Sequence, residues 1–494
     1  MSPQRSQSGG PLIALAAVVL LPALALFGLW RYADGKGGGE EGESLPTTVP
    51  GAAAPPAPPP PLSTPLISFR RIPGLIARDL NDDAFAQQVA SFAATLDSTS
   101  CLVVRLDGAE VGSHNPDLPV IPASNQKLLI AAAALHVLGP DHTFTTQAQA
   151  AGLSAGVVPG DLYLVGGGDP LLTTNDYPAE NINGYAVLNA TPLDTLADSI
   201  AAAGVSQIQG NLVADASRYD DEFFRPDWTD EERVLEAGPL DSLLVNDARF
   251  LTDDWQVANT PSAGAGEELA RLLEERGISI GGEVVDGTAP ADTPVVASIA
   301  SAALPAVIAE MESTSDNNTA ELLLKEIGFV RSGQGTTEAG AAAALVALQE
   351  LGIDTTGMVI SDGSGISNDN RVTCAALSQI LSQHEPDDEF SAGLPVAGET
   401  GTLSEAFVDS PVAGRLVAKT GTLENAPYNQ DPPSVKALSG YLPVEGGGTI
   451  EFSFILNSAG LLADQSVYRP IWDAFANVLA GYPSGPSAAD LGPG

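Results

Sequence analysis

The sequence predicts an α+β protein in which one domain is split by a second, inserted α+β domain. Three observations indicate this arrangement. A helical pattern followed by a hairpin opens the globular part, a hairpin followed by a helix closes it, and the segment between them alternates short strands with helices. With 494 residues, 44% of them hydrophobic, the chain is long enough to bury more than one core.

The opening elements have clear boundaries. Residues 79–96 place apolar side chains at helical spacing. Residues 101–106 form a strand that returns from Glu110 after an Asp-Gly turn, which predicts a hairpin. Residues 127–138 form an alanine-rich helix that ends at Gly139 and the proline after it.

The middle of the chain has a different secondary-structure pattern, in which short strands alternate with helices. Strands are expected at 160–165, 208–214 and 282–285, and a helix at 186–203. We therefore assign residues 145–296 to the inserted domain.

The last part of the globular region returns to long helices and strands. Helical segments are expected at 304–328, 336–352 and 464–479, and strands at 415–419, 437–443 and 448–457. Residues 71–144 and 297–482 would together form the split domain.

The first 70 residues lack a globular pattern. Residues 11–30 are an apolar run long enough to cross a bilayer, which predicts a signal anchor over 1–34. A cleaved signal peptide is the alternative, because Ala23-Leu24-Ala25 resembles a cleavage site. The Gly- and Pro-rich residues 35–70 predict a stalk, and the composition of 483–494 predicts a disordered tail.

Charge and metal-binding residue types exclude several functions. The formal charge of −41 argues against nucleic acid as a partner and against membrane contact other than through the N-terminal helix. The four histidines are not spaced as zinc ligands, so no metal is expected. Cys101 and Cys374 are expected as two buried thiols, with a disulfide as the alternative.

The first candidate motif is Ser124-Asn125-Gln126-Lys127, directly before the alanine-rich run. Residues three apart on a first helical turn share a face, so the Lys127 amine can take the proton of the Ser124 hydroxyl. The helix N-terminus offers backbone N–H groups to a developing oxyanion. On its own, this tetrad is a weak signal.

Two further motifs follow in the chain. Ser315 could relay a proton and the Asn317 amide could hold a substrate carbonyl, although Ser-Asp-Asn is equally typical of a helix N-cap. Lys419-Thr420-Gly421-Thr422 lies at the end of a predicted strand, where Lys419 supplies positive charge and Gly421 allows substrate to approach. The alternative for Lys419 is a charged edge-strand residue.

Residues 398–402, Gly-Glu-Thr-Gly-Thr, imitate the third motif but place a carboxylate where a cation is needed. Lys419 is therefore the better candidate. The order S-x-x-K, S-D-N, K-T-G is that of serine enzymes in which the hydroxyl of the first motif is acylated and the lysines and the second serine assist the reaction.

At this point the sequence resembles the low-molecular-mass class C penicillin-binding proteins, the D-alanyl-D-alanine carboxypeptidases/endopeptidases. The resemblance covers roughly residues 77–482. It is carried by the three motifs and by the segments Pro122–Ser124, Leu162–Pro170, Asp362–Gly365, Asp369–Arg371 and Leu438–Tyr441.

The resemblance implies a penicillin-binding, serine β-lactamase-like transpeptidase domain, with an antiparallel sheet flanked by helices. It also implies roles for the motif residues. Ser124 would attack the D-Ala-D-Ala carbonyl, Lys127 would act as the base, and Ser315 would relay the proton to the leaving D-Ala. Asn317, Lys419, Thr420, Gly421 and Thr422 would bind the substrate, and the backbone N–H groups of Ser124 and Thr422 would form the oxyanion hole.

The resemblance further implies no cofactor, peptidoglycan stem peptides as substrates, and penicillins as covalent inhibitors. The catalytic domain would then face the cell wall, outside the membrane. Two departures stand out: Ser124 and Ser315 are closer in sequence than expected for a member with two inserted domains, and residues 424–434 lengthen the loop after the third motif. A β-lactamase-like hydrolase, and a receptor that acylates without turnover, are the alternatives.

Overall fold

The computed structural model describes residues 72–177, 187–248, 260–425, 431–445, 447–461 and 465–492. The predicted signal anchor and stalk lie outside these ranges. Within them, none of the helices combines the length and the apolar character needed to cross a membrane.

A five-stranded antiparallel sheet joins the two ends of the globular part. Its strand order is β13 (Val417–Leu423), β14 (Ser434–Pro443), β15 (Thr449–Ser458), β1 (Cys101–Leu106) and β2 (Ala109–His114). Strand β1 pairs with β15, so segments from before and after the middle region share one sheet. The predicted α+β fold with an antiparallel sheet is confirmed.

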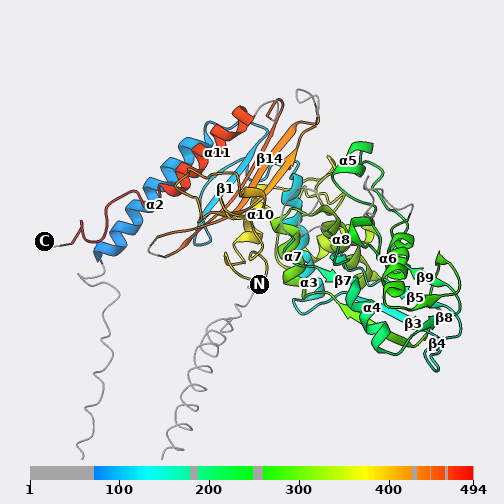
Figure 1. The fold of residues 1–494 in the computed structure, drawn as a ribbon. Helices are drawn as coiled ribbons and strands as arrows, with labels where there is room; N and C mark the ends of the chain where they lie inside the picture. The colour runs from blue at the N-terminus through cyan, green and yellow to red at the C-terminus, as the bar shows by residue number, and fades with distance from the viewer. Residues whose placement is uncertain are drawn as a thin grey trace, which may run out of the picture. The chain divides into compact units, whose positions relative to one another are not determined.

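Two terminal helices lie side by side over this sheet (Figure 1). They are α2 (Ile72–Ala93) and α11 (Gln465–Ala480). Phe475 of α11 packs its ring against Phe92 of α2 and against Phe454 of β15, with centroids 5.3 and 4.9 Å apart. The segment predicted as a disordered tail begins against α2, because Asn81 Nδ2 donates to the carbonyl of Pro486.

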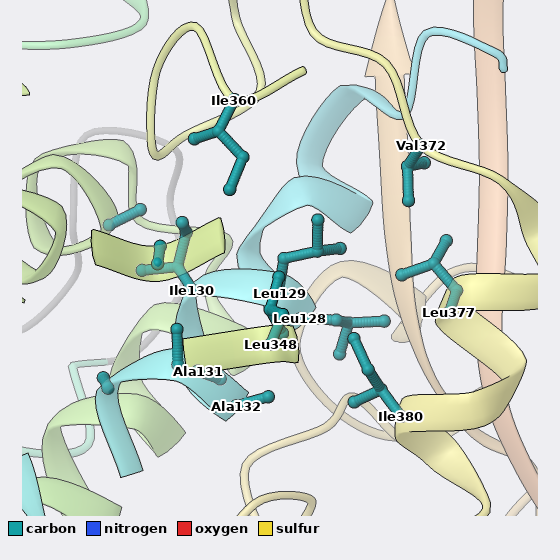
Figure 2. Packing of buried hydrophobic residues seen from close by; sticks show 14 of the residues in the cluster. Leu128, Leu129, Ile130, Ala131, Ala132, Leu348, Ile360, Val372, Leu377 and Ile380 are labelled. Atoms are coloured by element: carbon teal, nitrogen blue, oxygen red, sulfur yellow. The ribbon is translucent and has the colours of Figure 1, made fainter. Parts of the chain in front are cut away.

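A helical layer adjoins α3 (Gln126–Leu138), which is buried on all sides along its first nine residues. Small alanines let neighbouring helices approach closely, and a helix that is apolar all round belongs inside a core. Figure 2 shows Leu128 and Leu129 of α3 near Leu377 and Ile380 of α10 (Cys374–Leu381). The helices of this layer are α7 (Leu304–Ser313), α8 (Asn317–Ser332), α9 (Thr337–Glu350) and α10 (Cys374–Leu381).

The middle region has its own sheets. The larger has the order β11 (Val284–Asp286), β9 (Leu212–Asp215), β5 (Leu162–Val165), β3 (Thr145–Ala150) and β12 (Val295–Ala300). The smaller sheets are β10 (Ser279–Ile280) with β8 (Gln207–Ile208) and β4 (Val157–Val158), and β6 (Leu172–Thr173) with β7 (Thr191–Pro192). The helices are α4 (Leu193–Ala202), α5 (Asp230–Leu235) and α6 (Pro261–Glu275).

Two predicted elements of this region need correction. The strand expected at 208–214 is two strands, β8 and β9, interrupted at Gly210. A Cβ at Gly210 would lie 2.6 Å from the backbone carbon of Gly160, so the chain bends there at a close crossing. The helix expected at 186–203 begins only at Leu193, after Pro192 in extended conformation.

Cys101 and Cys374 form a disulfide, so the expectation of two free thiols is wrong. The bond links the start of β1 to the start of α10, across 273 residues of sequence. Both sulfur-bearing residues are fully buried in the core that also surrounds α3.

Removal of this disulfide is expected to destabilise the fold. A cross-link between distant residues restricts the unfolded chain, and its loss typically costs about 2 to 5 kcal/mol. The double variant Cys101→Ala/Cys374→Ala should therefore show a lower urea midpoint than the parent protein, measured by circular dichroism under oxidising conditions. An unchanged midpoint would show that the bond contributes no stability.

Candidate active site

Ser124 lies on a short 3-10 turn, Ala123–Asn125, that leads directly into α3. Ala123 has φ of 48°, in the left-handed region that is unfavourable for a residue with a Cβ. The opposing Gly365 approaches so closely that a Cβ there would lie 2.0 Å from Ala123 O. The turn that presents Ser124 is thus held by close backbone packing.

The Lys127 amine contacts three oxygen atoms. Its Nζ lies 3.0 Å from Ser124 Oγ, 2.7 Å from Asn317 Oδ1 and 2.6 Å from Ser364 O. The amide oxygen and the carbonyl can only accept, whereas a hydroxyl can also donate. A neutral amine has two N–H groups for the two acceptors, which leaves its lone pair for the Ser124 hydroxyl proton.

Burial lowers the pKa of Lys127 from 10.5 to about 8. The nearby carboxylates of Asp316, Asp362 and Glu321 act in the opposite direction but do not offset the loss of hydration. A lysine with this pKa is neutral in a substantial fraction of molecules near pH 8, as a general base requires.

The loop that supplies Ser364 O is fixed by buried carboxylates. Glu321 Oε1 accepts from the backbone N–H groups of Gly363 and Ser364, at 2.9 and 2.7 Å. Asp362 Oδ2 accepts from Trp228 Nε1 of the middle region at 3.0 Å. These bonds position the carbonyl that orients Lys127.

The second motif lies at the junction of α7 and α8. Ser315 has φ of 61°, and Asp316 caps α8 by accepting from Thr319 N at 2.5 Å. The N-cap interpretation is therefore correct for Asp316, while the catalytic roles of Ser315 and Asn317 stay predictions. Asn317 is held at both ends of its amide, since Oδ1 accepts from Lys127 and Nδ2 donates to Glu236 O at 2.6 Å.

The third motif lies within β13, because the strand predicted to end at residue 419 continues to Leu423. Lys419 is fully buried and its Nζ donates to Ser315 Oγ at 2.7 Å and to Thr420 O at 3.1 Å. Burial, and then the charge of Lys127, hold the pKa of Lys419 well below its usual value, while Glu312 acts in the opposite direction.

Gly421 brings β13 against the turn that carries Ser124. A Cβ at this position would lie 3.1 Å from Ser124 N and 3.0 Å from Pro122 O. Thr420 and Thr422 flank it, and Thr420 Oγ1 donates to Thr402 Oγ1 at 2.7 Å. The glycine allows the strand and the turn to lie edge to edge, with hydroxyl groups on both sides.

Two cavities meet at Ser124. The first, of about 770 Å³, is here named the acidic arm because of the carboxylates that line it: Asp227, Glu231, Glu232, Glu236, Asp369 and Glu424. The second, of about 680 Å³, is named the basic arm; it holds the cations Lys436 and Arg469, the carboxylates Glu236 and Glu405, and the rings of Tyr468 and Trp472. Ser124, Glu236, Asn317 and Thr422 line both arms.

The structure brings the eight predicted site residues into one place, but several others in the site were not predicted. Thr402 belongs to the segment rejected as an imitation of the third motif, yet its hydroxyl contacts Thr420. Ser364 contributes a carbonyl, which no sequence pattern reports. Lys436 donates to Thr422 Oγ1 at 2.7 Å from the strand that pairs with β13, but the strand predicted at 437–443 begins one residue after it.

Among the described residues, no group of three or more His, Cys, Asp or Glu side chains could hold a metal ion.

Comparison with known proteins finds relatives of this chain. The model of the D-Ala-D-Ala carboxypeptidase 3 (S13) family matches residues 86–253 and 251–481. The D-alanyl-D-alanine carboxypeptidase of Actinomadura sp. (strain R39) is 32% identical over 458 residues, covering 76% of this chain and 79% of that protein. Carboxypeptidase Rv3627c of Mycobacterium tuberculosis is 30% identical over 375 residues, covering 72% and 75%.

A solved structure supports the fold. Penicillin binding protein 4 (dacB) from Haemophilus influenzae superimposes with a TM-score of 0.63 at 21% identity, covering 79% of this chain and 98% of that one. The family match in two parts, the relatives and the serine–lysine geometry lead to one conclusion. The chain belongs to the D-Ala-D-Ala carboxypeptidase (S13) family and is a serine-type D-Ala-D-Ala carboxypeptidase.

Proposed function

We propose that Ser124 is the nucleophile of this carboxypeptidase and that Lys127 is its general base. The observation that carries the proposal is the set of bonds around Lys127 Nζ, which directs the amine to Ser124 Oγ. In the acylation step, Ser124 Oγ bonds to the carbonyl carbon of the penultimate D-Ala while its proton passes to Lys127. The backbone N–H groups of Ser124 and Thr422 are the proposed oxyanion hole.

Collapse of the tetrahedral intermediate breaks the C–N bond to the terminal D-Ala. The nitrogen of the leaving D-Ala needs a proton. In the proposed mechanism, Ser315 Oγ lies between this nitrogen and Lys419 Nζ. Ser315 gives its proton to the amine and is reprotonated through Lys419 or Lys127. Water then attacks the acyl-enzyme, which releases the shortened peptide acid and restores the Ser124 hydroxyl.

The charges of the two arms orient the substrate. A peptide ending in D-Ala-D-Ala has a terminal carboxylate. The described lining of the acidic arm has six carboxylates and no cation and repels it, whereas the lining of the basic arm has two cations beside two carboxylates. We therefore place the leaving D-Ala against Thr420 and Thr422, and the acyl part of the stem peptide in the acidic arm. The Asn317 amide has a second N–H group, which we assign to an amide carbonyl of the acyl part.

Penicillins carry a strained amide and a carboxylate in a similar arrangement, so we propose that they acylate Ser124 by the same step. A structure of the H. influenzae penicillin binding protein 4 has been solved in complex with a β-lactam. Peptidoglycan stem peptides are the proposed natural substrates, with cross-linked peptides as further candidates.

The test is release of D-Ala from an N-acylated peptide ending in D-Ala-D-Ala, by a protein that starts near residue 70. The parent protein should release one D-Ala per peptide, and Ser124→Ala should release none above background. Release by the variant at the parent rate would disprove the role of Ser124.

We also propose that the catalytic domain lies on the outer side of the cell membrane, held by the apolar residues 11–30 and the stalk. The buried disulfide supports this, because such bonds are common in oxidising compartments and rare in the cytoplasm. Protease added to intact, wall-stripped cells should degrade the domain. Protection until the cells are lysed would contradict the proposal.

A further inference from the structure

A cationic side chain outside the three motifs lies beside the site. Lys436 of β14 lies opposite Thr422 of β13 in the antiparallel register, and its Nζ donates to Thr422 Oγ1 at 2.7 Å. Both side chains line the basic arm, together with Ser124. The ammonium group is therefore next to a hydroxyl to which we have assigned the terminal carboxylate.

Aromatic rings hold this ammonium in place. Lys436 Nζ lies 4.6 Å from the centre of the Tyr468 ring and 5.5 Å from that of Trp472. A cation over ring faces is attracted by them and loses part of its hydration. Tyr468 and Trp472 both belong to α11 and are themselves buried, so the platform is rigid.

The charge around Lys436 favours an incoming anion. Burial lowers its pKa from 10.5 to about 8, the neighbouring Arg469 acts in the same direction, and Glu424 acts less strongly the other way. The chain has only 21 basic residues against 62 acidic ones, yet Lys436 and Arg469 both line one arm, with Glu236 and Glu405, and Lys419 is buried beside it. A carboxylate placed there would relieve the repulsion between the cations.

We propose that Lys436 binds the free carboxylate of the departing D-Ala and makes the enzyme specific for peptides that end in a carboxylate. This inference rests on the proposed function of Ser124 and adds a specificity-determining residue to it. Lys419, which donates to Ser315 and to the Thr420 carbonyl, then serves the proton relay, while Lys436 serves recognition.

The test compares two substrates in the parent protein and in Lys436→Met. One is an N-acylated peptide ending in D-Ala-D-Ala, and the other is the same peptide with a C-terminal carboxamide. Loss of one hydrogen bond between charged groups should lower kcat/KM for the carboxylate peptide about 10- to 100-fold. The value for the carboxamide should change by less than about twofold, since it has no charge for Lys436 to bind.

Two controls separate recognition from structure. Lys436→Arg keeps a cation and a donor to Thr422, so it should retain most of the preference for the carboxylate. Arg415→Met removes a cation from a partly exposed residue that donates to Pro443 O, outside both arms, and should leave the preference unchanged. An equal loss on both substrates in Lys436→Met would assign the residue a structural role and overturn the proposal.

A second readout does not depend on turnover. Acylation of Ser124 by benzylpenicillin, which has a carboxylate, should slow about tenfold in Lys436→Met, while acylation by its methyl ester should not. An unchanged preference in both assays would also overturn the proposal. Failure of the parent protein to release D-Ala or to form an adduct would instead refute the proposed role of Ser124, so the two failures are distinguishable.

Discussion

Replacement of Lys127 by methionine is expected to slow acylation of Ser124 about 100- to 10,000-fold, the usual contribution of a positioned general base. Methionine has a similar length but cannot accept the hydroxyl proton. It also leaves Asn317 Oδ1 and Ser364 O without the donor that now contacts both. The measurement is the rate of adduct formation with the methyl ester of benzylpenicillin, followed by intact mass.

The same reaction should depend on pH in a defined direction. Only the neutral amine can take the proton, and burial places the pKa of Lys127 at about 8. The acylation rate of the parent protein should therefore rise with pH up to about 8 and level off above it. Lys127→Met should lack this rise; a parallel rise in the variant would assign the pH dependence to another group.

Lys325→Met is a matched control for the loss of a buried lysine. Lys325 is fully buried, but its Nζ binds Asp220 Oδ1 at 2.5 Å and it lines neither arm. This variant should lose stability, because Asp220 loses its partner. Its folded fraction should be acylated within about threefold of the parent rate. A loss as large as that of Lys127→Met would show that charge burial, and not base catalysis, explains the effect.

Lys419→Met and Ser315→Ala are each expected to lower D-Ala release about 100- to 1,000-fold, since the two side chains form one relay. The bond between Lys419 Nζ and Ser315 Oγ, at 2.7 Å, is the basis for this expectation. Burial holds the pKa of Glu312 well above its usual range, so this carboxyl can stay neutral when Lys419 is removed and the fold should survive.

The double variant Lys419→Met/Ser315→Ala tests whether the two residues act together. Groups that form one unit give effects that are far from additive. The double variant should therefore be about as slow as the slower single variant. A loss equal to the product of the two single losses would mean that Lys419 and Ser315 act independently.

The motif residues were predictable from sequence because each motif is short and chemically constrained. Ser124 and Lys127 lie on one turn, so their contact follows from helical geometry alone. Contact between Lys127 and Asn317, 190 residues apart, could be expected only from the combination of motifs. The sheet was predictable too, since its strands have regular patterns and clear turns.

Other parts of the site depend on tertiary structure that no local pattern reports. Thr402 contacts Thr420 only because a loop returns to β13. Its sequence segment, residues 398–402, does not predict a catalytic motif, because it has a carboxylate where the motif needs a lysine. The Ser364 carbonyl is a backbone atom, so residue type gives no signal. The disulfide required Cys101 and Cys374 to be adjacent across 273 residues, which spacing cannot show.

The most direct test of the central claim is the mass of the protein during incubation with benzylpenicillin, with Ser124→Ala as the control. A persistent adduct of one penicillin per chain, lost in Ser124→Ala, is the predicted result. Digestion of the adduct should place the added mass on the peptide that contains Ser124. An adduct hydrolysed within seconds would instead indicate β-lactamase activity. No adduct, or an equal adduct in Ser124→Ala, would contradict the assignment of Ser124 as the nucleophile.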